Sequence, residues 1–183
     1  MAKEQSKAVK RRFYDPMYHT KYYKGHGIDI GCGDDSLKQY IKFFPLLSNV
    51  DEWDLPQGDA QIMPGVKDNT YDFVTSSHCL EHLNNPVDAL KKWIDITKKN
   101  GHILVAIPDF ELYERKMWPS RFNSQHNHFF DVTSVMELLL RVKGRANVIR
   151  LNRIEDFWDP LYPGDQTKLP NTECAIEFVL RKC

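Results

Sequence analysis

Short apolar stretches alternate with amphipathic ones through the middle of the chain. The apolar stretches are rich in β-branched and aromatic residues and are bounded by glycine, proline, asparagine or aspartate, a pattern typical of strands. Parallel strands of this kind need cover on both faces of their sheet. The pattern predicts strands over residues 27–30, 46–50, 71–75, 102–107, 147–151 and 175–180.

Three segments between the strands have apolar residues at helical spacing. Residues 36–44 and 133–142 each place theirs on one face. The third helix begins at Asn85 and Pro86, because asparagine caps free N–H groups and proline fits a first turn. It ends near Gly101, since glycine readily adopts the left-handed conformation that stops a helix. This alternation predicts an α/β fold with a mostly parallel sheet, in which the last two strands pair antiparallel.

Composition narrows the class of protein. A chain of 183 residues corresponds to one domain with modest additions. Its 25 basic and 25 acidic residues balance, so net charge gives no attraction to nucleic acid or to an anionic membrane. The sequence contains neither an apolar run that could span a membrane nor an export signal. We therefore expect a cytoplasmic protein with reduced cysteines and no membrane partner.

The N-terminal region has its own composition. Residues 1–12 hold five basic residues against one acidic residue, which favours a solvated, partly frayed tail. An arm that touches an acidic substrate is the alternative. Residues 13–26 are rich in aromatic side chains and are expected to pack across an edge of the domain or to act as a lid.

A glycine turn follows the first predicted strand, where α/β sheets bind nucleotides. Gly31 permits a tight turn and Gly33 permits close approach of a ligand to the backbone. Asp34 and Asp35 lie where a pyrophosphate would sit and would repel it. A cationic ligand without phosphate, such as S-adenosylmethionine, fits better; the alternative is an acidic helix start that complements the helix dipole.

Two further acidic residues fit an adenosyl ligand. Asp51 follows the second predicted strand, where a carboxylate can accept both hydroxyls of a ribose. Asp59 and Ala60 could accept the adenine amino group and leave room for its ring, although Asp59 also fits an ordinary loop. The ribose contact alone does not separate NAD from S-adenosylmethionine.

The order of these motifs resembles the class I S-adenosylmethionine-dependent methyltransferases. The matching segments are Gly-Ile-Asp-Ile-Gly-Cys-Gly at 27–33, Val-Asp at 50–51, Gly-Asp-Ala at 58–60, 68–74, Ser-His-Cys-Leu-Glu-His-Leu at 77–83 and Asn-Gly-His-Ile-Leu-Val at 100–105. The resemblance covers residues 25–110. Aspartate stands at 35, where the family usually has its third glycine.

The resemblance implies a Rossmann-like, doubly wound fold with a mostly parallel seven-stranded sheet, helices on both faces and an antiparallel last strand. It divides the chain into a basic and aromatic arm, 1–24, and a methyltransferase domain, 25–183, in which 109–131 form a lid on the substrate side. It also implies S-adenosylmethionine as cofactor. The residues expected to bind this cofactor are Asp29, Gly31, Cys32, Gly33, Asp51, Glu52, Asp59, Ala60, Ser77 and His78.

Histidines near the strand ends are candidates for a general base, since imidazole accepts protons near neutral pH. We favour His126, then His82, while Glu81 is expected to orient a neighbour. His82 could instead fix a local turn, and His126 could pack or form a metal pair with His128; we expect no metal site. Aromatic residues of the 109–131 segment would form a substrate wall or ordinary packing.

The leading hypothesis is methyl transfer from S-adenosylmethionine to an oxygen or nitrogen of a small-molecule acceptor, such as a sugar or surface-glycan precursor. One alternative is a cofactor-binding, catalytically silent partner protein. An NAD-linked reductase is another, but the chain lacks the Tyr-x-x-x-Lys pair of such enzymes. Nucleic acid is not expected as a substrate, and the sequence specifies no oligomeric state.

Overall fold

The computed structural model describes residues 4–162, 165–169 and 171–183, and its centre is a six-stranded sheet. The strand order is β2-β1-β3-β4-β6-β5, with the first four strands parallel and β6 antiparallel to both neighbours. The expected α/β sheet with its antiparallel last strand is confirmed, but the described residues form six strands, not seven. The strands are β1 (Gly25–Ile30), β2 (Leu47–Trp53), β3 (Tyr71–Ser77), β4 (Thr97–Pro108), β5 (Ala146–Asp156) and β6 (Glu173–Lys182).

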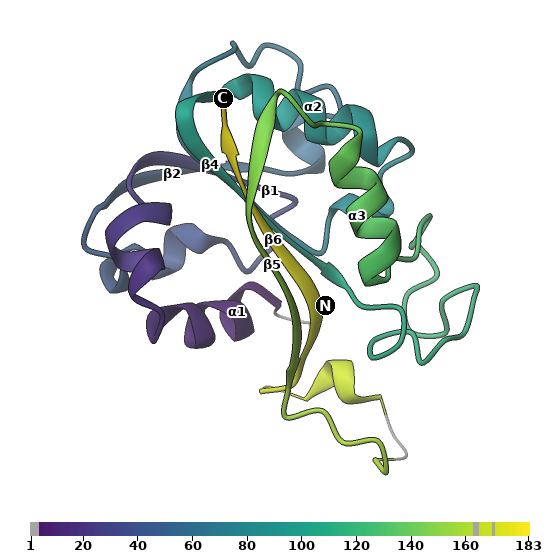
Figure 1. Ribbon diagram of the computed structural model, residues 1–183. Coiled ribbons are helices and arrows are strands. Elements are labelled where there is room, and N and C mark those ends of the chain that lie inside the picture. Colours follow the sequence, from purple (N-terminus) through teal and green to yellow (C-terminus); the bar gives the residue numbers. More distant parts are fainter. Residues whose placement is uncertain (1–3, 163–164, 170) are drawn as a thin grey trace.

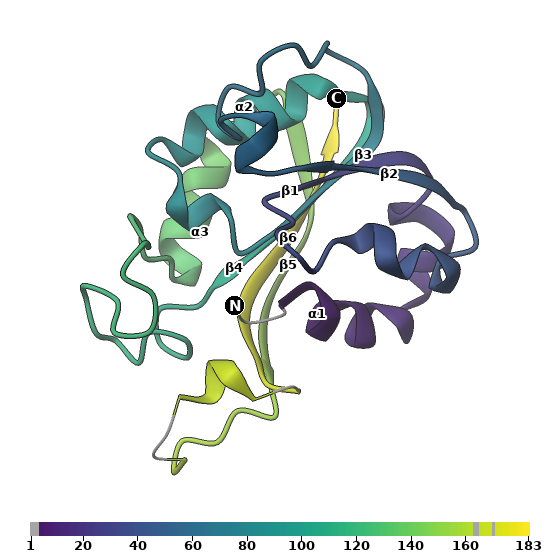
Figure 2. The same ribbon diagram turned by 180° about the vertical axis from the view of Figure 1, so that it is seen from behind.

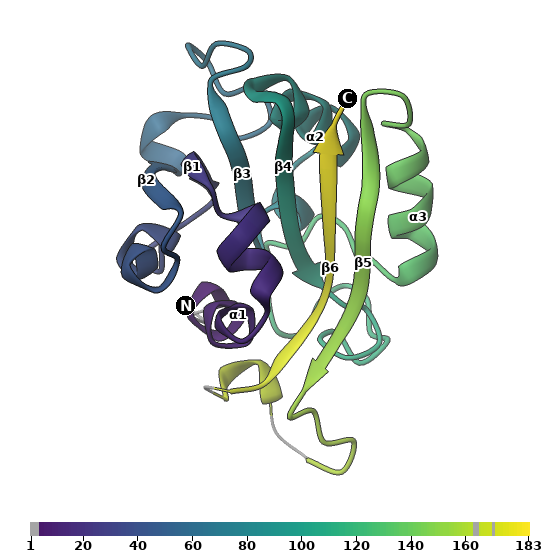
Figure 3. The ribbon, with the colours of Figure 1, turned by 60° about the vertical axis from the view of Figure 1, so that its left-hand side comes forward.

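Helices cover both faces of this sheet. Helix α1 (Glu4–Phe13) lies over one face, and α2 (Pro86–Ile96) and α3 (Val132–Leu140) lie over the other (Figures 1 and 3). Seen from behind, the region 109–131 extends beyond the sheet as an irregular loop (Figure 2). The remaining helices are single turns or short runs: a π-helix η1 (Tyr18–Tyr22) and 3-10 helices η2 (Leu37–Phe43), η3 (Leu55–Gln57), η4 (Leu80–His82) and η5 (Gln166–Lys168).

Alternate residues along each central strand build two separate cores. On β4, Ile103 and Val105 face the core beneath α2 and α3, whereas Leu104 faces the core beneath α1. The second core also contains Tyr18 and Tyr23 of the aromatic segment, both fully buried. This segment therefore packs on one face of the sheet, whereas the sequence analysis expected it at an edge of the domain or as a lid.

Local sequence signals set the start of α2 as predicted. Asn85 accepts a hydrogen bond from the Asp88 N–H, and Pro86 is the first helical residue. The expected end is wrong, because the helix stops at Ile96 and Asn100 takes the left-handed conformation at φ +64°. Gly101 serves close packing instead, since an added Cβ would lie 2.5 Å from the Asp72 carbonyl oxygen.

The predicted helix over 36–44 is the 3-10 helix η2 instead. Ser36 caps its start by accepting the Lys38 N–H. Phe44 is extended, at φ −124° and ψ 97°, as expected of a residue that precedes a proline.

Residues 4–12 of the N-terminal segment are not a frayed tail, and residues 1–3 lie outside the described residues. Arg12 is fully buried and donates two hydrogen bonds to Glu177 of β6, at 2.9 and 2.7 Å. Arg11 donates to both Glu173 and Glu177. The expectation of a solvated tail is therefore wrong, and its cause is tertiary: the acidic partners lie about 160 residues away in sequence. No helix among the described residues is long and apolar enough to cross a membrane.

Candidate functional site

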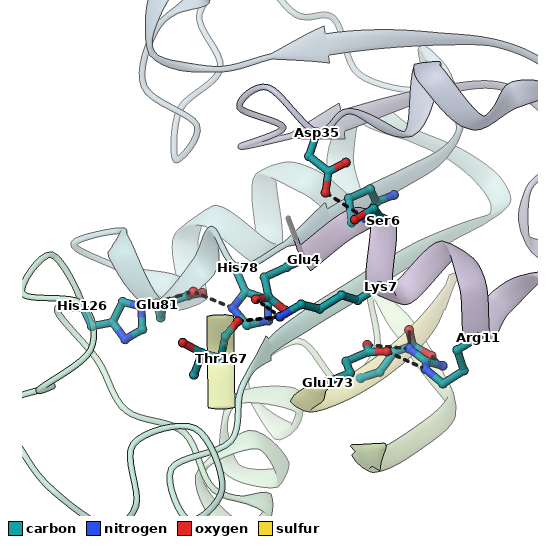
Figure 4. Close-up of polar contacts among 12 residues, drawn as sticks. Glu4, Ser6, Lys7, Arg11, Asp35, His78, Glu81, His126, Thr167 and Glu173 are labelled. Atoms are coloured by element: carbon teal, nitrogen blue, oxygen red, sulfur yellow. Dashed lines mark hydrogen bonds and ion pairs between the residues drawn. The ribbon is translucent and has the colours of Figure 1, made fainter. Parts of the chain in front are cut away.

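A cavity of about 760 Å³ lies at the edge where the parallel strands end. Its walls come from five places: the glycine turn after β1, the end of β3 with η4, the 109–131 loop, the first turns of α1, and η5. The sequence predicted the first three. The contribution of α1 was foreseen only as an alternative, and Figure 4 shows this helix beside the site.

The glycine turn has the conformation that its sequence predicts. Gly31 and Gly33 adopt φ +72° and +52°, which disfavours other residues. An added Cβ at Gly31 would lie 2.4 Å from the Cys79 Cβ, so this backbone must approach its neighbour closely. The Gly33 N–H donates to Asp54 at 2.8 Å and thereby ties the turn to the end of β2.

Asp29 is a buried carboxylate on the floor of the cavity. It accepts the Leu37 N–H at 2.7 Å, while burial raises its pKa to about 7. A cationic ligand would favour the ionised form of such a group. Cys32 also lines the cavity, and burial raises the pKa of its thiol to about 12.

The two aspartates of the turn differ in their surroundings. Asp35 is buried and accepts hydrogen bonds from the Ser6 N–H and the Tyr40 hydroxyl, at 2.8 and 2.7 Å. Asp34 is exposed at the mouth of the cavity. Asp35 therefore docks α1 onto the turn, a role that the sequence analysis missed.

The second-strand acid lies elsewhere than expected. Strand β2 continues to Trp53, so Asp51 is inside the strand and not at its end. Its carboxylate accepts the Tyr71 hydroxyl at 3.0 Å and lies 3.0 Å from His26. Glu52 is exposed and pairs with Lys38. Neither residue lines the cavity.

Asp54 is the carboxylate at the end of β2. It is half-buried, accepts the N–H of Gly33, and caps η3 through the N–H of Leu55. The apolar Trp53 could have indicated Asp54 from the sequence, since an apolar residue after Asp51 suggests that the strand continues; Trp53 is indeed buried. The structure thus corrects the position assigned to Asp51.

The predicted adenine pair lies outside the cavity. Asp59 is exposed and accepts the Gln61 N–H at 2.7 Å, which is an ordinary turn contact. The Ala60 carbonyl accepts the Trp93 indole N–H at 2.9 Å. Their role toward a cofactor stays a prediction.

Ser77 and His78 lie at the end of β3, as predicted, and both line the cavity. His78 has φ +54°, an uncommon conformation for this residue, and burial lowers the pKa of its imidazole to about 3. Its Nε2 lies 3.8 Å from Glu4 of α1, and its Nδ1 lies 3.8 Å from Glu81 (Figure 4).

The two predicted bases lie side by side at this end of the cavity. The rings of His82 and His126 are 4.9 Å apart between centroids. His126 Nδ1 contacts Glu114 Oε1 at 2.5 Å, and His82 Nδ1 contacts the Gln125 carbonyl at 2.9 Å. Glu81 lies between them with no exposed surface, and burial raises its pKa to about 8.

Helix α1 contributes a buried ion pair that sequence reasoning missed. Lys7 donates to Glu4 at 2.9 Å and to the Thr167 carbonyl at 2.6 Å. Burial raises the pKa of Glu4 to about 7, although the nearby Lys7 acts to lower it.

The aromatic residues of the 109–131 loop differ in position. Tyr113 and Phe122 line the cavity, whereas Trp118 is exposed and does not.

This geometry fits S-adenosylmethionine. The positive-φ glycine turn leaves the backbone open on one side, a buried carboxylate lies below it, and Asp54 closes the turn. A family model for a methyltransferase domain matches residues 3–142. The chain belongs to the class I S-adenosylmethionine-dependent methyltransferases. It is an enzyme of this family, with S-adenosylmethionine as cofactor.

Solved structures share the fold. An S-adenosylmethionine-dependent methyltransferase from Archaeoglobus fulgidus is 16% identical, with a TM-score of 0.66, covering 98% of this chain and 94% of its own. One from Listeria monocytogenes is 15% identical, with a TM-score of 0.61 and coverage of 97% and 98%. A methyltransferase from Haloferax volcanii, in complex with the Trm112 activator, is 14% identical, with a TM-score of 0.61 and coverage of 97% and 95%. No curated protein matches the chain.

Proposed function

We propose that this methyltransferase transfers a methyl group to an oxygen or nitrogen of a small-molecule acceptor. The observation that carries the proposal is the cavity, which has the glycine turn at one end and the histidines at the other. Its volume of about 760 Å³ is in the range typical of small-molecule sites. Helix α1 and the 109–131 loop both form walls of the cavity, which suits an acceptor small enough to fit entirely inside it.

The cofactor end of this cavity is the glycine turn. Asp29, Gly31 and Gly33 would surround the methionine part, where a negative floor complements the ammonium group. We place the ribose at Asp54, because a carboxylate at the end of β2 is within reach of the turn whereas Asp51 is engaged inside the strand. The bound cofactor supplies an electrophilic methyl group, and the protein aligns the acceptor behind it.

The acceptor end is formed by the loop and η4. Tyr113 and Phe122 present aromatic surface there, next to the hydrogen-bonding side chains of Asn123 and Gln125. Such a mixture of ring faces and polar groups complements a sugar, including a surface-glycan precursor. The general-base roles of His126 and His82 stay predictions.

A large nucleic-acid substrate is disfavoured by how the basic residues are used. Arg11 and Arg12 are paired with Glu173 and Glu177, so their charge is neutralised within the fold. Lys7 is buried against Glu4. These pairs account for much of the basic character of the N-terminal segment, and phosphate contacts need such charges to be accessible.

The direct test is incubation with S-adenosylmethionine labelled at its methyl group and a panel of sugars, nucleotide sugars, phenols and amines. Mass spectrometry then identifies any acceptor that gains one methyl group. Calorimetry on the same preparation measures cofactor binding. Cofactor binding without transfer to any acceptor, including those in a cell extract, would favour the silent partner protein and contradict the proposal.

A further inference from the structure

Glu81 is unusual among the carboxylates of the described structure. Its side chain has no exposed surface, and neither carboxylate oxygen has a hydrogen-bond partner. Burial of a carboxylate without a partner is costly, and native structures seldom retain one without a functional reason. Because Glu81 lines the cavity, that reason can be a ligand.

Two imidazole nitrogens lie close to the same carboxylate oxygen. Glu81 Oε1 is 3.7 Å from His82 Nε2 and 3.8 Å from His126 Nε2. The coordinating atoms of these three residues all lie within 4.8 Å of one another. Atoms bound to one ion at about 2.1 Å lie roughly 3–3.5 Å apart, so small side-chain movements would bring these three into coordination distance.

Hydrogen bonds at the far side of each ring determine which nitrogen is free. His82 Nδ1 faces the Gln125 carbonyl, which only accepts, so Nδ1 carries the hydrogen. His126 Nδ1 donates likewise to Glu114, and the other oxygen of Glu114 has no hydrogen-bond partner among the described residues. In neutral rings both Nε2 atoms then present lone pairs to Glu81, with no donor between them.

We propose that Glu81, His82 and His126 bind a divalent transition-metal ion of the zinc type at the acceptor end of the cavity. The sequence analysis expected no metal here, and ion binding through both Nε2 atoms would replace the general-base roles predicted for His82 and His126. Two imidazoles and one carboxylate are a typical donor set for such an ion, and three protein ligands leave a position open. Glu114 acts as a positioning residue, since metal-bound histidines usually donate their second N–H to a carboxylate or carbonyl.

The open position faces the cavity. An oxygen of the acceptor bound there would be held beside the methyl donor, and the ion would lower the pKa of an acceptor hydroxyl. This role toward the acceptor rests on the proposed function, whereas ion binding does not. Figure 4 shows Glu81 between His126 and His78, with His78 toward Glu4 of α1.

The test is titration of chelator-treated enzyme with ZnCl₂ by calorimetry, with MgCl₂ as the comparison ion. We expect one zinc ion per chain and at least tenfold weaker binding in Glu81→Gln, His82→Gln and His126→Gln. His128→Gln is the matched control, because His128 lies on the same loop but bonds the Leu83 carbonyl and is absent from the cluster. It should bind zinc as the wild type does.

Absence of zinc uptake by the wild type, or equal affinity in all four variants, would overturn the proposal. Should the variants fail to fold, the wild type loaded with Co²⁺ still decides: absorption bands of nitrogen-coordinated cobalt are expected, and the spectrum of hexaaqua cobalt would refute the site. Cofactor binding measured without metal separates this outcome from failure of the proposed function.

Discussion

Two fully buried glutamates, Glu177 and Glu81, have opposite environments. Glu177 on β6 is contacted by Arg11, Arg12 and the Tyr18 hydroxyl. Burial alone would raise its pKa, but the two guanidinium groups hold the pKa well below its usual range. Glu81 has no such partner, and burial raises its pKa to about 8.

The difference indicates that one buried glutamate has a structural role and the other a functional role. A carboxylate whose hydrogen bonds are all made by the protein fixes α1 on the sheet. A carboxylate without partners, in the wall of a cavity, is available to a ligand. The following predictions test this comparison.

Replacing Glu177 should have the largest effect on stability. Glu177→Gln leaves the fully buried Arg12 guanidinium without its anion, while Arg11 keeps Glu173; breaking a buried pair in this way typically costs about 3–5 kcal/mol. Glu81→Gln removes an unpartnered carboxylate and is expected to leave the free energy of unfolding unchanged or higher. Denaturant titration of the metal-free variants measures both. Equal destabilisation by the two changes would contradict the comparison.

Acid should weaken the same ion-pair cluster. The folded-state pKa of Glu177 is below its unfolded value, so its contribution is present above the unfolded pKa and is lost as the pH falls toward the folded one. The stability difference between wild type and Glu177→Gln should therefore shrink as the pH is lowered below about 4.5. Thermal unfolding across this range gives the measurement; a constant difference would argue against an ionised Glu177.

The two aspartates near the end of β2, neither of which lines the cavity, make a matched pair. Asp54→Asn should weaken binding of S-adenosylmethionine roughly tenfold, about 1.4 kcal/mol, through loss of a charged hydrogen-bond acceptor. Asp51→Asn should leave the affinity near that of the wild type, since its carboxylate contacts Tyr71 and His26. Calorimetry compares the two. The reverse order of effects would restore the ribose role to Asp51.

The smallest expected effect is a pH dependence of cofactor binding through Asp29. Its pKa is about 7 because of burial, with Arg12 lowering it and Asp35 and Glu52 raising it. The ionised form attracts the ammonium group, so affinity should fall a few-fold from pH 8 to pH 6. Asp29→Asn should flatten this dependence, and an unchanged slope would assign it to another group.

Local signals were enough to locate the strands within residues 25–110, the glycine turn and the start of α2. Each depends on neighbours within a few residues: a strand followed by two glycines, or asparagine before proline. The histidines at 78, 82 and 126 were also recognised, because they lie at or beyond strand ends. The resemblance added the family and its cofactor, which the family match confirms.

The register between strands and the ion pairs between distant segments could not be predicted in this way. The end of β2 depends on its pairing with β1, where Trp53 lies opposite Ile30, so the choice between Asp51 and Asp54 could not be made locally. The helix over 4–13 is held by Glu173 and Glu177, about 160 residues away in sequence. The residues next to the helix give no indication of these partners.

The sequence by itself determined the sheet class, the glycine turn after the first strand and the histidines near the strand ends, because these follow from short-range patterns of polarity and backbone freedom. Only the tertiary structure decided which charges are neutralised. Arg12 donates hydrogen bonds to Glu177, whereas Glu81 lies near imidazole nitrogens and accepts no hydrogen bond, and that difference arises from how distant segments are brought together in the fold.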